Sequence, residues 1–252
     1  MSGRIDEQVK ATNLGLLFNA IKAHILNAQT KKRAYTVGRK HYDIDNDLFS
    51  LMLDERMNYS CGYWRNAKNL EQAQINKLDL VCRKLHLKPG MSVLEIGCGW
   101  GGFAKYAAEN YGVSVHGISI SKEQVKYAEA SCKGLNTSFE FKDYRELNTE
   151  YDSIVSIGMF EHVGYKNYKE YMEVVNRCLK EDGLFLLHTI GRNNSGLAAD
   201  PWITKYIFPN GMTPSSRQIS DAVEDIFVVE DWHNFGQDYD ATLMSWNENF
   251  QN

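Results

Sequence analysis

Five short apolar runs recur through the middle of the chain, with segments of helical apolar spacing before and between them. The runs predict strands at Ser92–Ile96, Val113–Ile118, Ser138–Phe141, Ser153–Ile157 and Leu184–Thr189. Apolar residues three and four positions apart predict helices at about 73–85, 101–110, 122–131 and 167–179, the last of them ended by Glu181-Asp182-Gly183. Because this alternation is typical of βαβ units, we expect an α/β fold with a doubly wound, mostly parallel sheet and helices on both faces.

The N-terminal part carries one further helical pattern. Apolar residues fall at Leu14, Leu17, Phe18, Ile21 and Ile25, and the basic run Lys31-Lys32-Arg33 follows them. This spacing predicts an amphipathic helix over 14–26. Its apolar face either packs on the rest of the protein or contacts an anionic bilayer surface, and the sequence leaves both alternatives open.

Composition narrows the class of protein. The 252 residues are 43% hydrophobic and 24% charged, which suits one globular core, and the net charge of −4 provides no basic surface for nucleic acid. The five cysteines show no Cys-x-x-Cys spacing, and no group of His and Cys has metal-ligand spacing, so we expect reduced thiols and no metal. Without a signal-peptide pattern or a membrane-spanning apolar run, the expected location is the cytoplasm or the membrane face next to it.

A glycine-rich turn follows the first predicted strand. Glu95-Ile96 leads into Gly97-Cys98-Gly99-Trp100-Gly101-Gly102 and then into a helix, an arrangement that brings the backbone close to a nucleotide ligand. The spacing fits the dinucleotide pattern G-x-G-x-x-G and equally the S-adenosylmethionine pattern E/D-x-G-x-G. The second strand ends at His116–Ser121 without the acidic residue that an NAD ribose requires, whereas Glu95 supplies the acid of the methyltransferase pattern. The turn therefore favours S-adenosylmethionine.

Several longer motifs are more specific than the glycine turn. They are His41–Ile44, Asn58–Trp64, Gly97–Gly102, Met159–Gly164, Leu187–Gly191, Asp200–Ile203, Lys205–Gly211 and Asp231–Gly236. In these motifs, which span nearly everything after residue 35, the chain resembles the cyclopropane-fatty-acyl-phospholipid synthases and the related mycolic acid cyclopropane synthases. The resemblance implies a Rossmann-like class I fold of S-adenosylmethionine-dependent methyltransferases.

The resemblance and the glycine turn together imply a set of cofactor contacts. The expected S-adenosylmethionine-binding residues are Tyr59, Ser60, Glu95, Gly97, Gly99, Gly101, Ser119, Ile120, Gln124 and Tyr144. Gln124, one helical turn into its helix, is a candidate ribose partner in place of the missing acid. Relatives often carry Gly-Trp-Glu where this chain has Asp143-Tyr144-Arg145, and here Tyr144 keeps an aromatic face for the contact to the adenine edge.

The resemblance also implies a bicarbonate ion next to the transferable methyl group. The residues that would hold it are Cys61, Glu161, His188, the backbone of Ile190, and Tyr239. Methylation of an isolated alkene leaves a carbocation, and closing a three-membered ring then requires a base that removes a proton from the added methyl group. We conjecture that aromatic rings such as Tyr63, Trp64, Tyr168 and Tyr171 stabilise the cation. Cys82, Cys132 and Cys178 are expected to be ordinary buried side chains.

The function that the resemblance implies is methylene transfer from S-adenosylmethionine to the double bond of an unsaturated phospholipid acyl chain. The expected partner is then a phospholipid surface, at the inner face of the membrane, and not a nucleic acid. Two other functions stay open: methylation of a small nucleophile, and an inactive cofactor-binding fragment or subunit.

Relatives usually extend further at both ends. We therefore expect an N-terminal helical and cofactor-covering region over 1–72, and a catalytic domain over 73–252 that lacks the final antiparallel strand. Because an unpaired strand leaves backbone groups unmatched, a homodimer or a complementing C-terminal chain is the expected remedy.

Overall fold

The structure of the protein is a computed structural model, and it describes residues 46–196, 202, 208 and 211–251. The amphipathic helix predicted over 14–26 and most of the motif at 200–211 lie outside these residues. Among the described helices, none combines the length and the apolar character needed to cross a membrane.

A parallel sheet forms the centre of the fold, with the strand order β3-β2-β1-β4-β5. Its strands are β1 Ser92–Ile96, β2 Ser114–Ser119, β3 Thr137–Phe141, β4 Tyr151–Ile157 and β5 Leu179–His188. The order reverses beside β1, which pairs with both β2 and β4, and ligands of open α/β sheets bind at such a switch point. The predicted α/β fold is confirmed, and within the described residues every strand pair is parallel.

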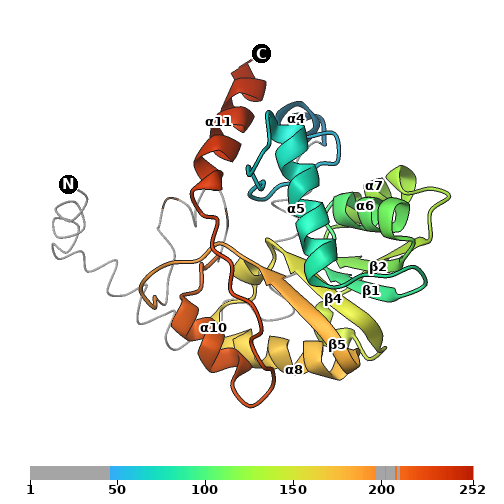
Figure 1. Ribbon diagram of the computed structural model, residues 1–252, viewed down its shortest axis with the longest axis vertical. Coiled ribbons are helices and arrows are strands. Elements are labelled where there is room, and N and C mark those ends of the chain that lie inside the picture. The colour runs from blue at the N-terminus through green and yellow to red at the C-terminus, as the bar shows by residue number, and fades with distance from the viewer. Residues whose placement is uncertain (1–45, 197–201, 203–207, 209–210, 252) are drawn as a thin grey trace, which may run out of the picture.

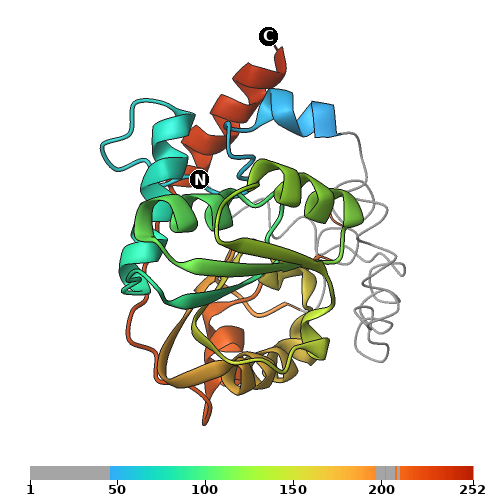
Figure 2. The same cartoon turned by 90° about the vertical axis from the view of Figure 1, so that its right-hand side faces the viewer.

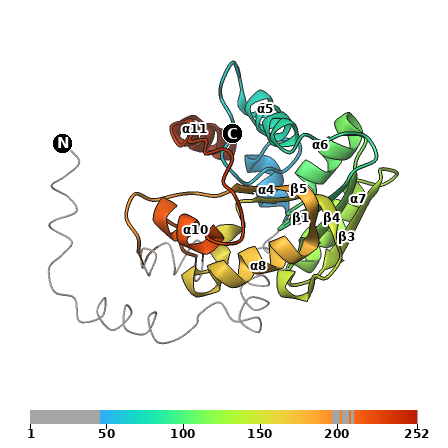
Figure 3. The same ribbon diagram turned by 60° about the horizontal axis from the view of Figure 1, so that its bottom comes forward.

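Helices cover both faces of this sheet (Figures 2 and 3). They are α4 Asn46–Met52, α5 Leu70–Lys84, α6 Gly102–Tyr111, α7 Lys122–Ser131, α8 Tyr168–Cys178, α10 Ser216–Val223 and α11 Asp238–Gln251. Three short 3-10 turns are η1 Tyr144–Glu146, η2 Phe160–His162 and η3 Tyr165–Asn167. The division expected at residue 72 stays a prediction. Helix α5 runs across that point without a break.

The two layers follow from the alternation of side chains along a strand. Val93 packs with Leu78 of α5 and Phe103 of α6, whereas its neighbour Leu94 packs with Tyr171 of α8 on the opposite face. All five side chains are almost fully buried, and each such burial stabilises the fold by about 1.5–3 kcal/mol. The apolar runs of the sequence thus serve two cores at once.

One predicted boundary is wrong. The segment Glu181-Asp182-Gly183 was expected to end the helix before the fifth strand, but α8 ends at Cys178 and β5 already begins at Leu179. The pairing of β4 with β5 shifts register between Tyr151 and Ser153, opposite this segment. Asp182 adopts a φ of 62°, so the chain forms an irregularity inside the strand and then returns to the ladder.

The C-terminal helix α11 was not predicted from the sequence. It lies beside α4, although the two helices are far apart in the sequence (Figure 1). Its buried residues Thr242 and Trp246 are four positions apart and face the loop before α5. Trp246 shares a small apolar cluster with Phe49 of α4 and Trp100 of the glycine turn, which fixes this helix over the end of the sheet.

Candidate active site

The glycine turn, residues 97–102, forms a cradle between β1 and α6. Gly97, Gly99 and Gly101 have φ values of 85°, 52° and 86°, a region that side chains other than glycine rarely adopt. A Cβ at Gly97 would lie 2.7 Å from the side chain of Met159, and one at Gly101 would lie 3.0 Å from Ala128. At Gly99 no atom lies within 4 Å of that position. Gly97 and Gly101 therefore serve packing as well as the turn, while Gly99 faces space that a ligand can occupy.

Glu95 lies at the end of β1 next to this cradle and is only 3% exposed. Its carboxylate accepts a backbone hydrogen bond from Ala104, but Oε2 has no hydrogen-bond partner among the described residues. Burial raises the pKa of Glu95 well above its ordinary range, and the charge of Lys77 opposes that shift. A buried acceptor left open in this way fits a ligand that brings its own N–H donor.

The turn after β2 lies next to the glycine cradle. The N–H groups of Gly97 and Cys98 both donate to the carbonyl of Ile118 at 3.0 Å, which ties the two turns together. Ser119 donates its hydroxyl to Oε1 of Gln124 at 2.8 Å, and both side chains are buried. Ile120 between them is partly buried. Ser119, Ile120 and Gln124, expected among the cofactor contacts, thus lie in one turn, and their contact with a cofactor stays a prediction.

Tyr144, expected at the adenine edge, is 4% exposed in η1. Its ring packs edge-on against Tyr171 with centroids 5.0 Å apart, and the Arg145 guanidinium lies 4.6 Å from its ring centre. Its hydroxyl has no partner among the described residues. The adenine contact remains a prediction. Tyr171 itself, and Tyr168 beside it, pack in the core below the sheet, where Tyr168 donates to the carbonyl of Met212.

The segment Tyr59-Ser60-Cys61 crosses above the end of the sheet. The ring of Tyr59 lies between Phe49 and Trp246, with centroid distances of 5.4 and 5.3 Å. Cys61 is 8% exposed, and burial raises the pKa of its thiol to about 11. At neutral pH Cys61 is therefore a hydrogen-bond donor and not a thiolate nucleophile.

Helix α11 holds this segment in place. Thr242 accepts two hydrogen bonds, from the N–H of Gly62 at 3.1 Å and from the indole N–H of Trp64 at 2.9 Å. The carboxylate of Asp238 accepts the backbone N–H of Trp64 at 2.7 Å. These contacts join residues about 180 positions apart in sequence, so no local pattern in the chain predicts them.

Glu161 lies in η2, directly after β4, and is 9% exposed. Its Oε1 accepts the backbone N–H of Ile190 at 2.7 Å, whereas Oε2 has no partner among the described residues. Burial raises the pKa of Glu161 and so favours its protonated form. The N–H of Ile190, whose backbone was expected at the ion, donates to Glu161, and its contact with an ion stays a prediction.

His188 is the last residue of β5, and its ring stacks on Phe235 with centroids 5.4 Å apart. Its Nδ1 has no hydrogen-bond partner among the described residues. Burial, together with the nearby charge of Lys77, lowers the pKa of His188 to about 3, so the imidazole is neutral at physiological pH.

Tyr239 completes the group from the first turn of α11. Its pKa is raised chiefly by burial and further by Tyr59, Glu161 and Cys61 around its hydroxyl. Cys61 and Glu161 thus lie near Tyr239, Ile190 donates to Glu161, and His188 lies two residues before Ile190. These residues come from four separate segments, and we call them the polar cluster: Cys61, Glu161, His188, Ile190 and Tyr239. No group of three or more metal-ligating side chains occurs in the described part of the chain.

Sequence reasoning missed Lys77 of α5, which is 1% exposed and donates to Oγ of Ser60 at 2.8 Å. The signal was present, because Ala73, Lys77 and Val81 repeat every four residues and share one helix face. A lysine on an otherwise buried face is rare enough to mark a site.

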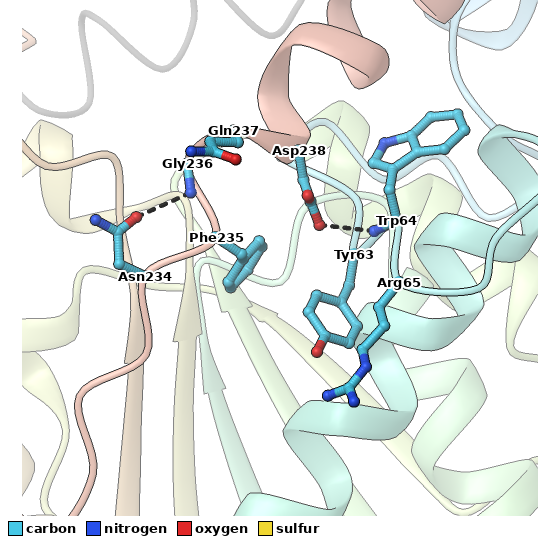
Figure 4. A pocket seen from close by; sticks show the side chains of 8 residues that line it. All are labelled: Tyr63, Trp64, Arg65, Asn234, Phe235, Gly236, Gln237 and Asp238. Atoms are coloured by element: carbon cyan, nitrogen blue, oxygen red, sulfur yellow. Dashed lines mark hydrogen bonds between the residues drawn. The ribbon is translucent and has the colours of Figure 1, made fainter.

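A pocket of about 500 Å³ opens beside the polar cluster, between Tyr63, Trp64 and Arg65 on one side and residues 234–238 on the other (Figure 4). Phe235 lines this pocket and also stacks on His188, so one ring separates the two. Tyr63 meets Phe235 edge-on at 5.5 Å. Three of the residues that line the pocket are aromatic, and the ring of Phe235 lies between the pocket and His188 at the end of β5.

A known protein family matches most of this chain. The family model described as mycolic acid cyclopropane synthetase matches residues 29–252. The chain is 60% identical over 228 residues to the cyclopropane-fatty-acyl-phospholipid synthase of Escherichia coli K12, a match that covers 90% of this chain and 60% of that protein. It is 36% identical over 225 residues to cyclopropane mycolic acid synthase 3 of Mycobacterium tuberculosis, covering 82% of this chain and 78% of that one.

A solved structure extends the likeness to three dimensions. The mycolic acid cyclopropane synthase crystallised with SAH and CTAB has a TM-score of 0.80 and 32% identity to this chain, with 86% of this chain and 83% of that one covered. The present chain spans only 60% of the length of the Escherichia coli relative. Because the family model nevertheless matches most of the chain, this chain belongs to the mycolic acid cyclopropane synthetase family.

Proposed function

We propose that the chain binds S-adenosylmethionine and transfers a methylene group from it to the double bond of an unsaturated phospholipid acyl chain, yielding a cyclopropane. One observation carries this proposal: Oε2 of Glu161 and Nδ1 of His188 are polar atoms without partners at the ends of adjacent strands, beside the glycine cradle. The names of the relatives point the same way, since the Escherichia coli protein is a cyclopropane-fatty-acyl-phospholipid synthase.

The residues around the cradle fit S-adenosylmethionine. Space at Gly99, the open carboxylate oxygen of Glu95 and the ordered pair Ser119 and Gln124 suit a nucleoside with an amino-acid tail. S-adenosylmethionine, when bound, supplies a methyl group on a positively charged sulfur. The glycine backbone approaches the ligand closely, and Glu95 accepts from its ammonium group. The structural relative was crystallised with SAH, which supports this use of the cradle.

The polar cluster suits a small anion such as bicarbonate. Burial raises the pKa of Cys61, Glu161 and Tyr239 and so favours the protonated form of each. The thiol and the phenol are donors at neutral pH, and Glu161 presents its open Oε2. A neutral His188 adds either a donor or an acceptor, according to its tautomer. Bicarbonate, when bound, supplies a base without leaving a bare protein carboxylate beside a cation. The chain's own residues hold that base in place and exclude water from it.

The substrate proposed is a lipid, with a phospholipid surface at the cytoplasmic face of the membrane as partner. The pocket lies next to His188, with the ring of Phe235 between them, and it offers the rings of Tyr63, Trp64 and Phe235 to an acyl chain. Its rings of Tyr63 and Trp64 remain the candidates for stabilising a cation, by about 0.5–2 kcal/mol for each well-placed ring. Tyr168 and Tyr171 are core residues and are less suited to this role.

The test is incubation of the whole chain with methyl-labelled S-adenosylmethionine and vesicles of a dioleoyl phospholipid. We expect label in the lipid and an acyl chain heavier by one CH₂, and no label in vesicles of the saturated dipalmitoyl lipid. Omission of bicarbonate from CO₂-free buffer should lower the rate, and its addition should restore it. Label only in a water-soluble product would favour a small nucleophile, and cofactor binding without transfer would favour an inactive subunit; either result would overturn the proposal.

A further inference from the structure

Lys77 is buried from solvent and lies between the segment Tyr59-Ser60-Cys61 and the end of β1. Its ammonium donates to Oγ of Ser60 at 2.8 Å and, more weakly, to Oδ1 of Asn58 at 3.5 Å. An ammonium buried to this degree costs several kcal/mol unless its surroundings compensate. An apolar residue of similar length would fill the same volume without that cost, so packing alone does not account for a lysine here.

The charges around Lys77 come from three directions. Asp54 lies before the segment, Glu95 lies on β1, and Cys61 and His188 face the same space from the polar cluster. Asp54 is already engaged, because its carboxylate accepts both the backbone N–H and the side-chain amide of Asn58 at 2.7 Å. Glu95 is only partly engaged: it accepts the backbone N–H of Ala104, but Oε2 has no partner among the described residues. A buried lysine and a buried glutamic acid with an open oxygen thus lie near the cradle.

We propose that Lys77 positions the amino-acid tail of the bound cofactor through Ser60. Because Lys77 donates to Oγ of Ser60, the Ser60 hydroxyl proton points away from the ammonium and is directed to the carboxylate of the tail. Oε2 of Glu95 lies open to the ammonium of the same tail, and the charge of that ammonium favours the carboxylate form of Glu95. Lys77 is a positioning residue that acts through Ser60, and its role rests on the proposed function, which makes S-adenosylmethionine the ligand.

The position of Lys77 couples binding of the cofactor to the uptake of a proton. Burial lowers the pKa of Lys77 to about 8, against the opposing charges of Asp54, Cys61 and Glu95. A carboxylate bound next to Ser60 favours the ammonium form, so the free protein takes up a proton when the ligand binds near pH 8. Affinity for a ligand with the tail should therefore fall as the pH rises above 8.

Two ligands separate this role from a structural one. S-adenosylhomocysteine carries the amino-acid tail, whereas 5′-methylthioadenosine keeps the adenosine and the sulfur but lacks the tail. By titration calorimetry we expect Lys77→Met to weaken binding of S-adenosylhomocysteine about ten- to hundredfold, the usual effect of losing a charge-assisted hydrogen bond. Binding of 5′-methylthioadenosine should change less than about threefold, and Ser60→Ala should behave in the same way.

The double variant tests whether Lys77 acts through Ser60. Combining Lys77→Met with Ser60→Ala should weaken S-adenosylhomocysteine binding much less than the product of the two single effects. Independent, multiplied effects would overturn the route through Ser60. Equal weakening of both ligands by Lys77→Met would show a structural role only, and failure of the wild-type chain to bind either ligand would overturn the proposed function itself.

The wild-type chain keeps the proposal testable if Lys77→Met does not fold. Calorimetry at pH 8 in two buffers of different ionisation enthalpy measures the protons taken up on binding. We expect uptake of up to one proton with S-adenosylhomocysteine beyond that seen with 5′-methylthioadenosine. Two contributions are subtracted first: the titration of the free ligand's own amino group, and any proton released by Glu95, which the same measurement on Glu95→Gln supplies. Equal uptake with the two ligands would overturn the proposal.

Discussion

The glycine cradle and the polar cluster lie side by side at the same end of the sheet, but they are built in opposite ways. The cradle is six consecutive residues whose backbone conformation, with positive φ at Gly97, Gly99 and Gly101, makes room for a ligand. The polar cluster gathers side chains from four segments, and burial sets the protonation of each. The cradle therefore depends on local geometry, while the cluster depends on the packing of the whole fold.

This difference predicts two kinds of failure. A change in the cradle should act by steric conflict and appear as lost binding of the cofactor. A change in the polar cluster should act through protons and hydrogen bonds and appear as lost turnover, with binding of the cofactor intact.

The largest effect is expected at Glu161. Glu161→Gln keeps an oxygen that can accept from the N–H of Ile190, but it replaces Oε2 with an amide nitrogen that cannot take part in proton transfer. We expect cyclopropane formation to fall about 10³-fold, within the range typical of lost acid–base groups. The affinity for S-adenosylhomocysteine, measured by calorimetry, should stay within about twofold. A rate within tenfold of the wild type would remove Glu161 from the chemistry.

The next effect is expected at Gly97. Gly97→Ala places a Cβ 2.7 Å from Met159 at a residue with a φ of 85°, so the turn must move. We expect about a hundredfold loss of affinity for S-adenosylhomocysteine, since the backbone then no longer approaches the ligand.

Gly90→Ala is the matched control for this change. Gly90 has a φ of 88°, but no atom lies within 4 Å of its Cβ position. Both variants should lose about 1–2 kcal/mol of stability to the backbone strain, whereas only Gly97→Ala should lose binding. Equal affinities in the two variants would show that the shape of the cradle does not govern cofactor binding.

The same contrast explains which parts of the structure could be predicted from the sequence. Strands β1 to β4 and helix α6 were predicted to within two residues because their periodicity is local, and the glycine turn was legible because its residues are consecutive. The polar cluster was named only through the resemblance, since no spacing joins Cys61, Glu161 and Tyr239. The boundary before β5 was misjudged because Asp182 and Gly183 signal a turn, while the sheet absorbs them as an irregularity in the strand.

A smaller effect is expected where α11 supports the polar cluster. Thr242→Val keeps the shape of the side chain but leaves the N–H groups of Gly62 and Trp64 without their shared acceptor. Because unpaired buried donors each cost about 1–3 kcal/mol, we expect the free energy of unfolding in urea to fall by about 2–3 kcal/mol. Thr242→Ser, which keeps the hydroxyl, should lose less than about 1 kcal/mol. If both variants lost the same amount, the hydroxyl would not be what holds this segment.

The smallest effect is a pH dependence that only the polar cluster should show. His188 has its pKa lowered to about 3 in the folded protein, from an ordinary value of 6.5. The unfolded chain therefore binds a proton between these values that the folded chain does not, so stability is fully present above pH 6.5 and is lost as the pH falls toward 3. From pH 7 to pH 5.5 this amounts to about 1 kcal/mol.

His188→Gln isolates that contribution, because every other titrating group remains in place. Urea denaturation at pH 7 and pH 5.5 should show the wild type losing about 1 kcal/mol more than the variant over this interval. The activity of the wild type should also show no inflection near pH 6.5 from this residue, because the imidazole is already neutral on both sides of it. Equal losses in the two proteins would mean that His188 titrates normally in the folded protein. Burial would then not set the protonation of the polar cluster, as the proposed binding of an anion requires.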